Sequence, residues 1–165
     1  MSGPGVRFRV AGRPMTQGSK TGIVVKGRAV LVETNRAALK PWREAVRSTA
    51  LEHLGDTWQP YPGPVHVRLL FALPKPASAP KTRRTWPVGA RSGDVDKLAR
   101  ACLDACTDAG VWRDDAQVVD LHVTKDYPGE HAGQLTPGVL VHVVPAELAA
   151  VAQLALTPQE HLAWP

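Results

Sequence analysis

The stretch DVDKLARACLDACTDAGVWRDDAQVVDLHVTK, residues 94–125, is the most informative part of this 165-residue chain for predicting its fold. Its first part repeats apolar residues at helical spacing and ends at Gly110, a typical helix stop. It predicts a helix over residues 95–109 whose apolar face carries Leu98, Ala101, Cys102, Ala105 and Cys106. The apolar run over residues 118–123 predicts a strand, so a helix and a strand follow each other with a short connection between them.

The flanking sequence adds a second helix and further strands. Alternating or clustered apolar residues predict strands over residues 6–11, 65–71 and 139–144. Residues 23–25 and 29–32 enclose Lys26-Gly27-Arg28 and predict a small hairpin with a basic tip. A helix is predicted from Asn35, whose side chain can cap it, to Gly55, with Pro41 close to its start.

The length of the chain favours a single domain, which we expect to span residues 1–150. Residues 146–156 predict a short terminal helix, and residues 151–165 are expected to form a tail. No run approaches the roughly 20 apolar residues that a membrane-spanning helix needs. The start of the chain also lacks the apolar region of a signal peptide. The expected location is therefore the cytosol of a bacterium or of a phage-infected host.

Charge is distributed unevenly along the chain. Residues 1–91 carry a net charge of +12, whereas residues 92–165 carry a net charge of −7. A basic half can neutralise phosphates, which makes a nucleic acid an expected partner. An uneven but merely solvated surface is the alternative.

Three basic segments are candidates for nucleic-acid contact, and each has a plain structural alternative. The tip of the hairpin is either such a contact or a solvated turn. Arg36, Lys40, Arg43 and Arg47 share one helical face, which is a common pattern on exposed helices without any ligand. Residues 74–91 hold four prolines, five cations, one tryptophan and no acids, which is typical of a mobile arm for phosphate contact and base stacking, or of a disordered loop.

Two pairs of carboxylates stand out in the acidic half, Asp94 with Asp96 and Asp114 with Asp115. If the backbone is extended before the helix, Asp94 and Asp96 point to one side and can face one ion. Hard cations such as Mg²⁺ prefer such oxygen ligands. The alternatives are that Asp96 caps the helix, or that the acids form simple ion pairs with Lys97 and Arg100, which follow in the first turns.

Other acid-rich or catalytic motifs are excluded by the residues at their required positions. A calcium-binding EF-hand loop starting at Asp94 would need glycine at Ala99 and glutamate at Ala105. A phosphate-binding G-x-x-x-x-G-K-[ST] loop, an H-E-x-x-H zinc helix and a G-x-S-x-G nucleophile elbow are absent from the sequence.

The stretch over residues 94–125 resembles the core signature of the RusA-type Holliday junction resolvases, D-x-D-N-L-x-K-x-x-x-D-A-L…G-x-x-x-D-D-x-Q-V…K. Residues 12–20, GRPMTQGSK, and the K-P-W-R segment at residues 40–43 are similar to phage members of that family. The resemblance covers about residues 6–144. It implies an α/β fold with a small mixed β-sheet packed with two main helices, in a homodimer that nicks branched DNA with Mg²⁺ or Mn²⁺.

The same resemblance assigns roles to individual residues. The metal-binding catalytic acids of the family correspond to Asp94, Asp96 and Asp115, and Asp114 is a further candidate ligand. The catalytic lysine of the family corresponds to Arg100, and its asparagine after D-x-D corresponds to Lys97. We therefore expect either Arg100 or Lys97 to supply the catalytic positive charge, although an arginine does not simply replace a lysine.

The predicted function is a metal-dependent, structure-selective endonuclease that resolves four-way or branched DNA junctions by paired nicks. A branched-DNA-binding protein without catalysis and a general flap or branched-DNA nuclease are the alternatives. The residues expected to contact DNA are all basic: Lys20, Lys26, Arg28, Arg43, Lys75, Lys81, Arg83, Arg84, Arg91 and Lys125.

Overall fold

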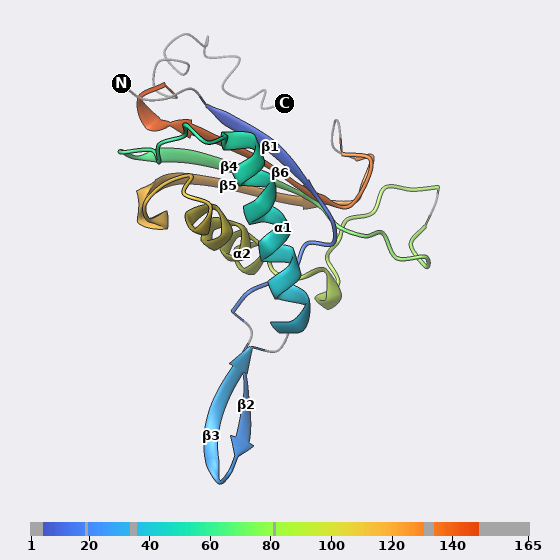
Figure 1. The fold of residues 1–165 in the computed structure, drawn as a ribbon. Coiled ribbons are helices and arrows are strands. Elements are labelled where there is room, and N and C mark those ends of the chain that lie inside the picture. The colour runs from blue at the N-terminus through green and yellow to red at the C-terminus, as the bar shows by residue number, and fades with distance from the viewer. Residues whose placement is uncertain (1–4, 19, 34–35, 81, 131–133, 149–165) are drawn as a thin grey trace.

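The computed structural model describes residues 5–18, 20–33, 36–80, 82–130 and 134–148 (Figure 1). Its centre is a four-stranded sheet in the order β1-β6-β4-β5. Strand β6 pairs antiparallel with both β1 and β4, whereas β4 pairs parallel with β5. These strands span Val6–Ala11 (β1), Val65–Ala72 (β4), Val118–Asp126 (β5) and Gly138–Pro145 (β6). The sheet is therefore mixed, as the sequence predicts.

Two helices, α1 (Arg36–Leu54) and α2 (Val95–Asp108), cover one face of this sheet (Figure 1). Alternate residues of β4 point into the core beneath them, since Val65, Val67, Leu69 and Phe71 are at most 1% exposed. This alternation is the period-two pattern of a strand with one covered face. The apolar stripe of α2, with both cysteines buried, packs on the same core.

Helix α2 connects the parallel strands β4 and β5 and so runs in the opposite direction to both of them. Its N-terminus lies at the end of β5, where the Lys125 side chain reaches the backbone of Gly93. Its C-terminus lies before the start of β4, where the Tyr61 N–H donates to the Val111 carbonyl at 3.0 Å. The two ends of α2 therefore lie at opposite ends of the parallel strands β4 and β5.

Two segments extend away from this body. The hairpin of β2 (Lys20–Val25) and β3 (Arg28–Glu33) projects beyond the N-terminal end of α1 (Figure 1). The loop after β4 extends on another side and returns through a short 3₁₀ helix, η1 (Ala90–Ser92), to α2. The hairpin and the irregular loop are both as predicted.

The helix boundaries differ only slightly from those predicted. Helix α1 contains Pro41 as its sixth residue, beyond the first turn, so the helix lacks the hydrogen bond that an N–H at this position would donate to the Ala37 carbonyl. Gly110, with a φ of 72°, follows the end of α2. Of the helix predicted over 146–156, only residues 146–148 are described, with a helical backbone, and the expected tail lies outside the described residues. No helix in the described ranges is long and apolar enough to span a membrane.

Candidate active site and nucleic-acid interface

The first pair of acids lies at the N-terminus of α2. Asp94 occupies the N-cap position in extended backbone, but its carboxylate makes no capping hydrogen bond. It binds Lys97 instead, with 2.9 Å between Lys97 Nζ and Asp94 Oδ2. Asp96 lies in the first helical turn. The interpretation of Asp96 as the cap is therefore wrong, because the helix begins at Val95, two residues earlier than that role requires.

Gly93 fixes the backbone just before these acids. Its φ of +77° lies in a region that side chains with a Cβ rarely adopt, and a Cβ there would lie 2.4 Å from Thr16 Cγ2. The loop that carries Thr16 packs along α2, since the Gln17 N–H donates to the Lys97 carbonyl at 3.0 Å. A glycine at position 93 thus lets the N-terminal loop approach the start of α2 closely.

Positive charges surround Asp94. Its pKa is lowered mainly by the hydrogen bond from Lys97, and also by the charges of Lys97 and Lys125. The pKa of Lys97 is raised in return, chiefly by Asp94 and to a smaller extent by Asp96. Lys125 Nζ donates to the Gly93 carbonyl at 2.6 Å and to Ser92 Oγ at 3.1 Å. The site therefore favours the ionised carboxylate of Asp94 beside two lysines.

Lys125 is one of the residues expected from the sequence to contact DNA. Its side chain lies at this site and donates to the backbone next to Asp94. The register pairs Lys125 with Phe71, which faces the helices. The alternation along β5, in which positions 121, 123 and 125 share a face, was a signal that could have predicted this orientation.

Of the two candidate catalytic cations, Lys97 is the one in contact with Asp94. Arg100 is exposed one turn further along α2. Its Nη1 atom lies close to Gly18, since a Cβ added to that glycine would be 3.2 Å from it. Its guanidinium thus lies along the N-terminal loop. The two cations occupy different surroundings, so they are not equivalent in position.

The second pair of acids lies beyond the other end of α2, at the 3₁₀ helix η2 (Asp115–Gln117). Asp114 caps this helix, and its carboxylate accepts from the Ala116 N–H at 2.8 Å. Gln117 completes the capping box and donates to the carbonyls of Tyr61 and Gly63 at 2.9 and 2.8 Å. Asp115 is exposed on this anchored turn. Asp114 therefore has a structural role that its sequence position did not reveal.

The two pairs are separated by the length of α2. A helix of 14 residues is about 21 Å long at 1.5 Å per residue. Within the described ranges, no three His, Cys, Asp or Glu side chains are grouped so that they could hold a metal ion. The acids of a single copy thus do not fit an ion that needs Asp94, Asp96 and Asp115 together.

One expected DNA contact in the loop is occupied by protein acids. Arg84 binds Asp126 at 2.5 Å and Glu130 at 2.6 Å, and Asp126 is buried. Arg84 also lies over the Trp86 ring, 5.0 Å from its centroid. Its charge is compensated by these two acids, and a contact with DNA would compete with both ion pairs. It anchors the loop to the end of β5.

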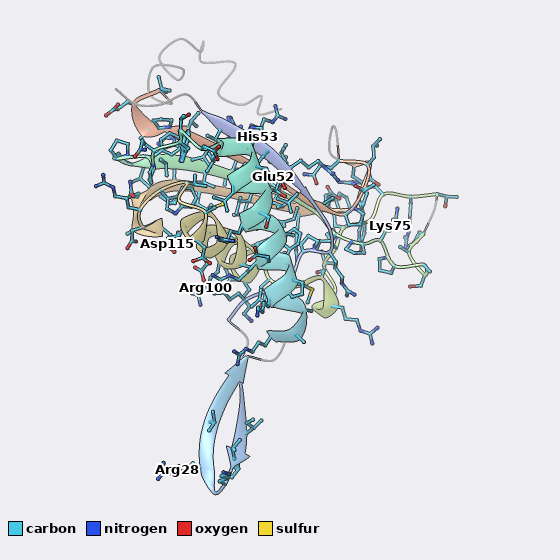
Figure 2. All side chains as sticks on the ribbon, viewed as in Figure 1. Arg28, Glu52, His53, Lys75, Arg100 and Asp115 are labelled. Atoms are coloured by element: carbon cyan, nitrogen blue, oxygen red, sulfur yellow. The ribbon has the colours of Figure 1, made fainter. Side chains whose placement is uncertain are left out.

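The remaining loop cations vary in their surroundings. Lys75 lies over the Tyr127 ring, 5.7 Å from its centroid, but is exposed, as are Arg83 and Arg91. Lys81 and the side chain of Lys20 fall outside the described residues. Figure 2 shows Lys75 and Asp115 on opposite sides of the body. The loop and the second acid pair are therefore far apart within one copy.

Helix α1 and the hairpin supply the other basic surfaces. A groove of about 300 Å³ along α1 is lined by Arg36, Lys40, Arg43 and Arg47, together with Leu39, Glu44 and Asp108. Two of these cations form ion pairs, Arg43 with Asp108 at 2.5 Å and Arg47 with Glu44 at 3.1 Å. Lys26 and Arg28 are exposed at the tip of the hairpin. Figure 2 shows Arg28 remote from the sheet and the helices.

The sequence of this chain is similar to those of known proteins. A family model described as endodeoxyribonuclease RusA matches residues 11–143. The uncharacterized protein YqaN of Bacillus subtilis is 28% identical over 133 residues, which cover 76% of this chain and 89% of that protein. The crossover junction endodeoxyribonucleases RusA of Escherichia coli K12 and of Enterobacteria phage 82 are each 57% identical over 35 residues. That match covers 21% of this chain and 29% of each relative.

Proposed function

Because the chain belongs to the RusA family of endodeoxyribonucleases, we propose that it is a structure-selective endonuclease. Its substrate is a four-way or otherwise branched DNA junction, which it resolves by paired nicks during recombination and repair. The match to the family model over most of the domain is the observation that carries this proposal. The charged cluster at the start of α2 supplies the chemical support.

The carboxylates at the start of α2 suit hydrolysis of a phosphodiester. The pKa of Asp94 is lowered by Lys97 and Lys125, so this acid stays ionised at neutral pH and remains an oxygen ligand. The proposed cofactor is Mg²⁺ or Mn²⁺, which when bound activates water and offsets charge on the reacting phosphate. Lys97 is the cation nearest to Asp94 and is favoured as the group that balances charge on the DNA.

The basic surfaces suit a nucleic acid. The groove along α1 presents several cations on one face, and the exposed hairpin tip adds Lys26 and Arg28. Such contacts to phosphates position a protein on DNA without reading its sequence. They fit an enzyme that selects a junction by its shape.

Paired nicks also require two active sites, and we propose a homodimer for this reason. A two-fold axis places identical sites against two opposed strands of a junction. The proposed location is the cytosol of a bacterium or an infected host, where such DNA is found. The nuclease domain is proposed to span residues 1–150.

The test compares three labelled substrates, an immobile four-way junction, a flap and a linear duplex, with Mg²⁺ or with EDTA. We expect cleavage of the junction in Mg²⁺, no cleavage in EDTA, and little cleavage of the duplex. Asp94→Asn should abolish cleavage but retain junction binding, because a negative charge is removed from the DNA-facing site. Asp56→Asn, an exposed acid after α1, is the matched control and should cut like the wild type.

Each contrary result selects another function. Binding of the junction without cleavage under any metal condition would identify a DNA-binding protein that does not cut. Stronger cleavage of the flap than of the junction would identify a general branched-DNA nuclease.

A further inference from the structure

The hairpin of β2 and β3 projects away from the sheet and the helices (Figure 1). We propose that its apolar side chains insert at the branch point of a DNA junction, against the faces of the base pairs that end there. The hairpin thereby distinguishes branched DNA from a linear duplex. This inference rests on the proposed endonuclease function. It goes beyond phosphate contacts by Lys26 and Arg28, because it concerns apolar contacts with bases.

Apolar side chains lie on both faces of the hairpin near its tip. Ile23 pairs with Val30 and Val24 pairs with Ala29, and the side chains of paired residues share a face. Successive residues of a strand point to opposite faces, so Ile23 and Val30 mark one face and Val24 marks the other. Val24 is 76% exposed, and Ile23 and Val30 are each 42% exposed. A two-stranded hairpin alone is only marginally stable in water, so these side chains indicate a partner that covers both faces.

The tip of the hairpin is a tight turn that carries a positive charge. Lys26 and Gly27 have φ values of 50° and 76°, and the two-residue type I′ turn requires a positive φ at both positions. Such a turn matches the right-handed twist of the two strands and keeps the ribbon narrow. Within the described ranges, Lys26 is the one residue other than glycine with a positive φ. A cation at this strained position suits a phosphate contact beside the apolar side chains.

The root of the hairpin lies next to the start of α2, where the proposed catalytic acids are. The Gln17 N–H donates to the Lys97 carbonyl at 3.0 Å. The Gln17 side chain donates to Asp104 of α2 and accepts from Arg43 of α1 at 3.4 Å. Strand β2 begins three residues after Gln17, and each strand of six residues is about 20 Å long. The hairpin can therefore reach the centre of a junction while the acids stay at the DNA backbone.

A branch point offers apolar surfaces that a linear duplex lacks. Within a duplex, each base pair is stacked between two others, so both of its faces are covered. At a branch point the strands diverge, and the base pairs that end the arms can expose a face. Every base has such a face, so contacts with it are independent of sequence. Other DNA-binding proteins insert apolar side chains between bases in a comparable way. A hairpin with two apolar faces therefore fits between the ends of two arms.

Charge favours DNA over a second copy of the chain as the partner of the hairpin. Residues 22–30 contain two cations, Lys26 and Arg28, and no acid. Arg28 shares its face with Val30, so a phosphate contact can accompany the apolar contact on that face. Two hairpins packed together at their tips would bring these cations close to each other, and like charges repel. A nucleic acid instead offers phosphates next to its bases.

The first test uses 2-aminopurine, an adenine analogue whose fluorescence rises when it is unstacked. It is placed either at the branch point of an immobile four-way junction or well inside one arm, and protein is added to saturation in EDTA. We expect the wild type to raise the fluorescence at the branch point only. The Ile23→Thr, Val24→Thr double variant keeps β-branched side chains and all charges, and should abolish this rise. The Ile23→Val, Val24→Ile double variant keeps both faces apolar and is the matched control, which should behave like the wild type.

Binding gives a second readout, measured for the junction and for a linear duplex at several salt concentrations in EDTA. The threonine double variant should lower the ratio of junction affinity to duplex affinity roughly tenfold, because apolar burial is lost. Its slope of log K against log salt should equal that of the wild type, because no charge changes. Lys26→Gln should lower the magnitude of the slope by about 0.9 and retain the fluorescence rise. Leu135→Thr, an exposed apolar position outside the hairpin, should leave the affinity ratio unchanged.

The outcomes separate this inference from the proposed function. If the wild type cuts the junction and the threonine double variant keeps the fluorescence rise and the affinity ratio, the hairpin does not insert and the endonuclease function stands. If the wild type cuts no DNA but raises the fluorescence and the threonine double variant does not, the proposed function fails and the hairpin contact stands. Absence of any rise with the wild type overturns the insertion. A lower mass of the threonine double variant in sedimentation equilibrium without DNA would identify a second copy as the partner and also overturn it.

Discussion

The salt dependence of junction binding should depend on some loop arginines and not on others. Arg83 and Arg91 are exposed, whereas the charge of Arg84 is compensated by Asp126 and Glu130. Each phosphate contact contributes about 0.9 to the slope of log K against log salt. The Arg83→Gln, Arg91→Gln double variant should therefore lower the magnitude of this slope by about 1.8. The Arg84→Gln variant should leave the slope unchanged, since it removes no free charge.

This difference is large enough to measure by fluorescence anisotropy with a labelled four-way junction in EDTA, where no cleavage is expected. A slope difference of about 1.8 means that a fourfold rise in salt weakens wild-type binding about 12-fold more than binding of the double variant. Equal slopes for the wild type and the double variant would show that the loop makes no phosphate contacts. A reduced slope for Arg84→Gln would show that Arg84 leaves its acids when DNA binds.

Two further changes test local features of the structure. Gly93→Ala should lower the free energy of unfolding by about 1–3 kcal/mol and slow nicking, because the new Cβ meets Thr16 beside Asp94. Gly89→Ala is the control, since φ is −72° there and no atom lies within 4 Å of the added Cβ. This control should leave the urea midpoint and the nicking rate unchanged. The pKa of His142 is lowered by burial and by the charges of Arg7 and Arg68, so the unfolded chain takes up this proton first as the pH falls. The contribution of His142 to the free energy of unfolding should be fully present above about pH 6.5 and decrease below it. Urea midpoints measured across that range should fall less for His142→Gln than for the wild type. An unchanged pH dependence would contradict the assignment of this decrease to His142.

The secondary-structure elements and the family could both be predicted from the amino-acid sequence. Helices and strands follow from apolar residues at periods of 3.6 and 2, and these patterns are local, so positions 95–109 and 65–71 could be assigned without a structure. The paired acids and the D-D-x-Q-V segment at residues 114–118 were sufficient to identify the RusA family. The charge asymmetry likewise required only the composition of the two halves.

Contacts between residues distant in the sequence could not be predicted in this way, because they depend on how the elements pack together. Arg84 is neutralised by an acid 42 residues away, and Lys125 reaches a carbonyl 32 residues away, so neither contact follows from local spacing. The family resemblance implied that Asp94, Asp96 and Asp115 are metal ligands together, but a rigid helix lies between the two acid pairs and keeps them apart within one copy. Helical hydrogen bonds fix the rise per residue along α2, so the two acid pairs, although close in the sequence, lie at opposite ends of this helix.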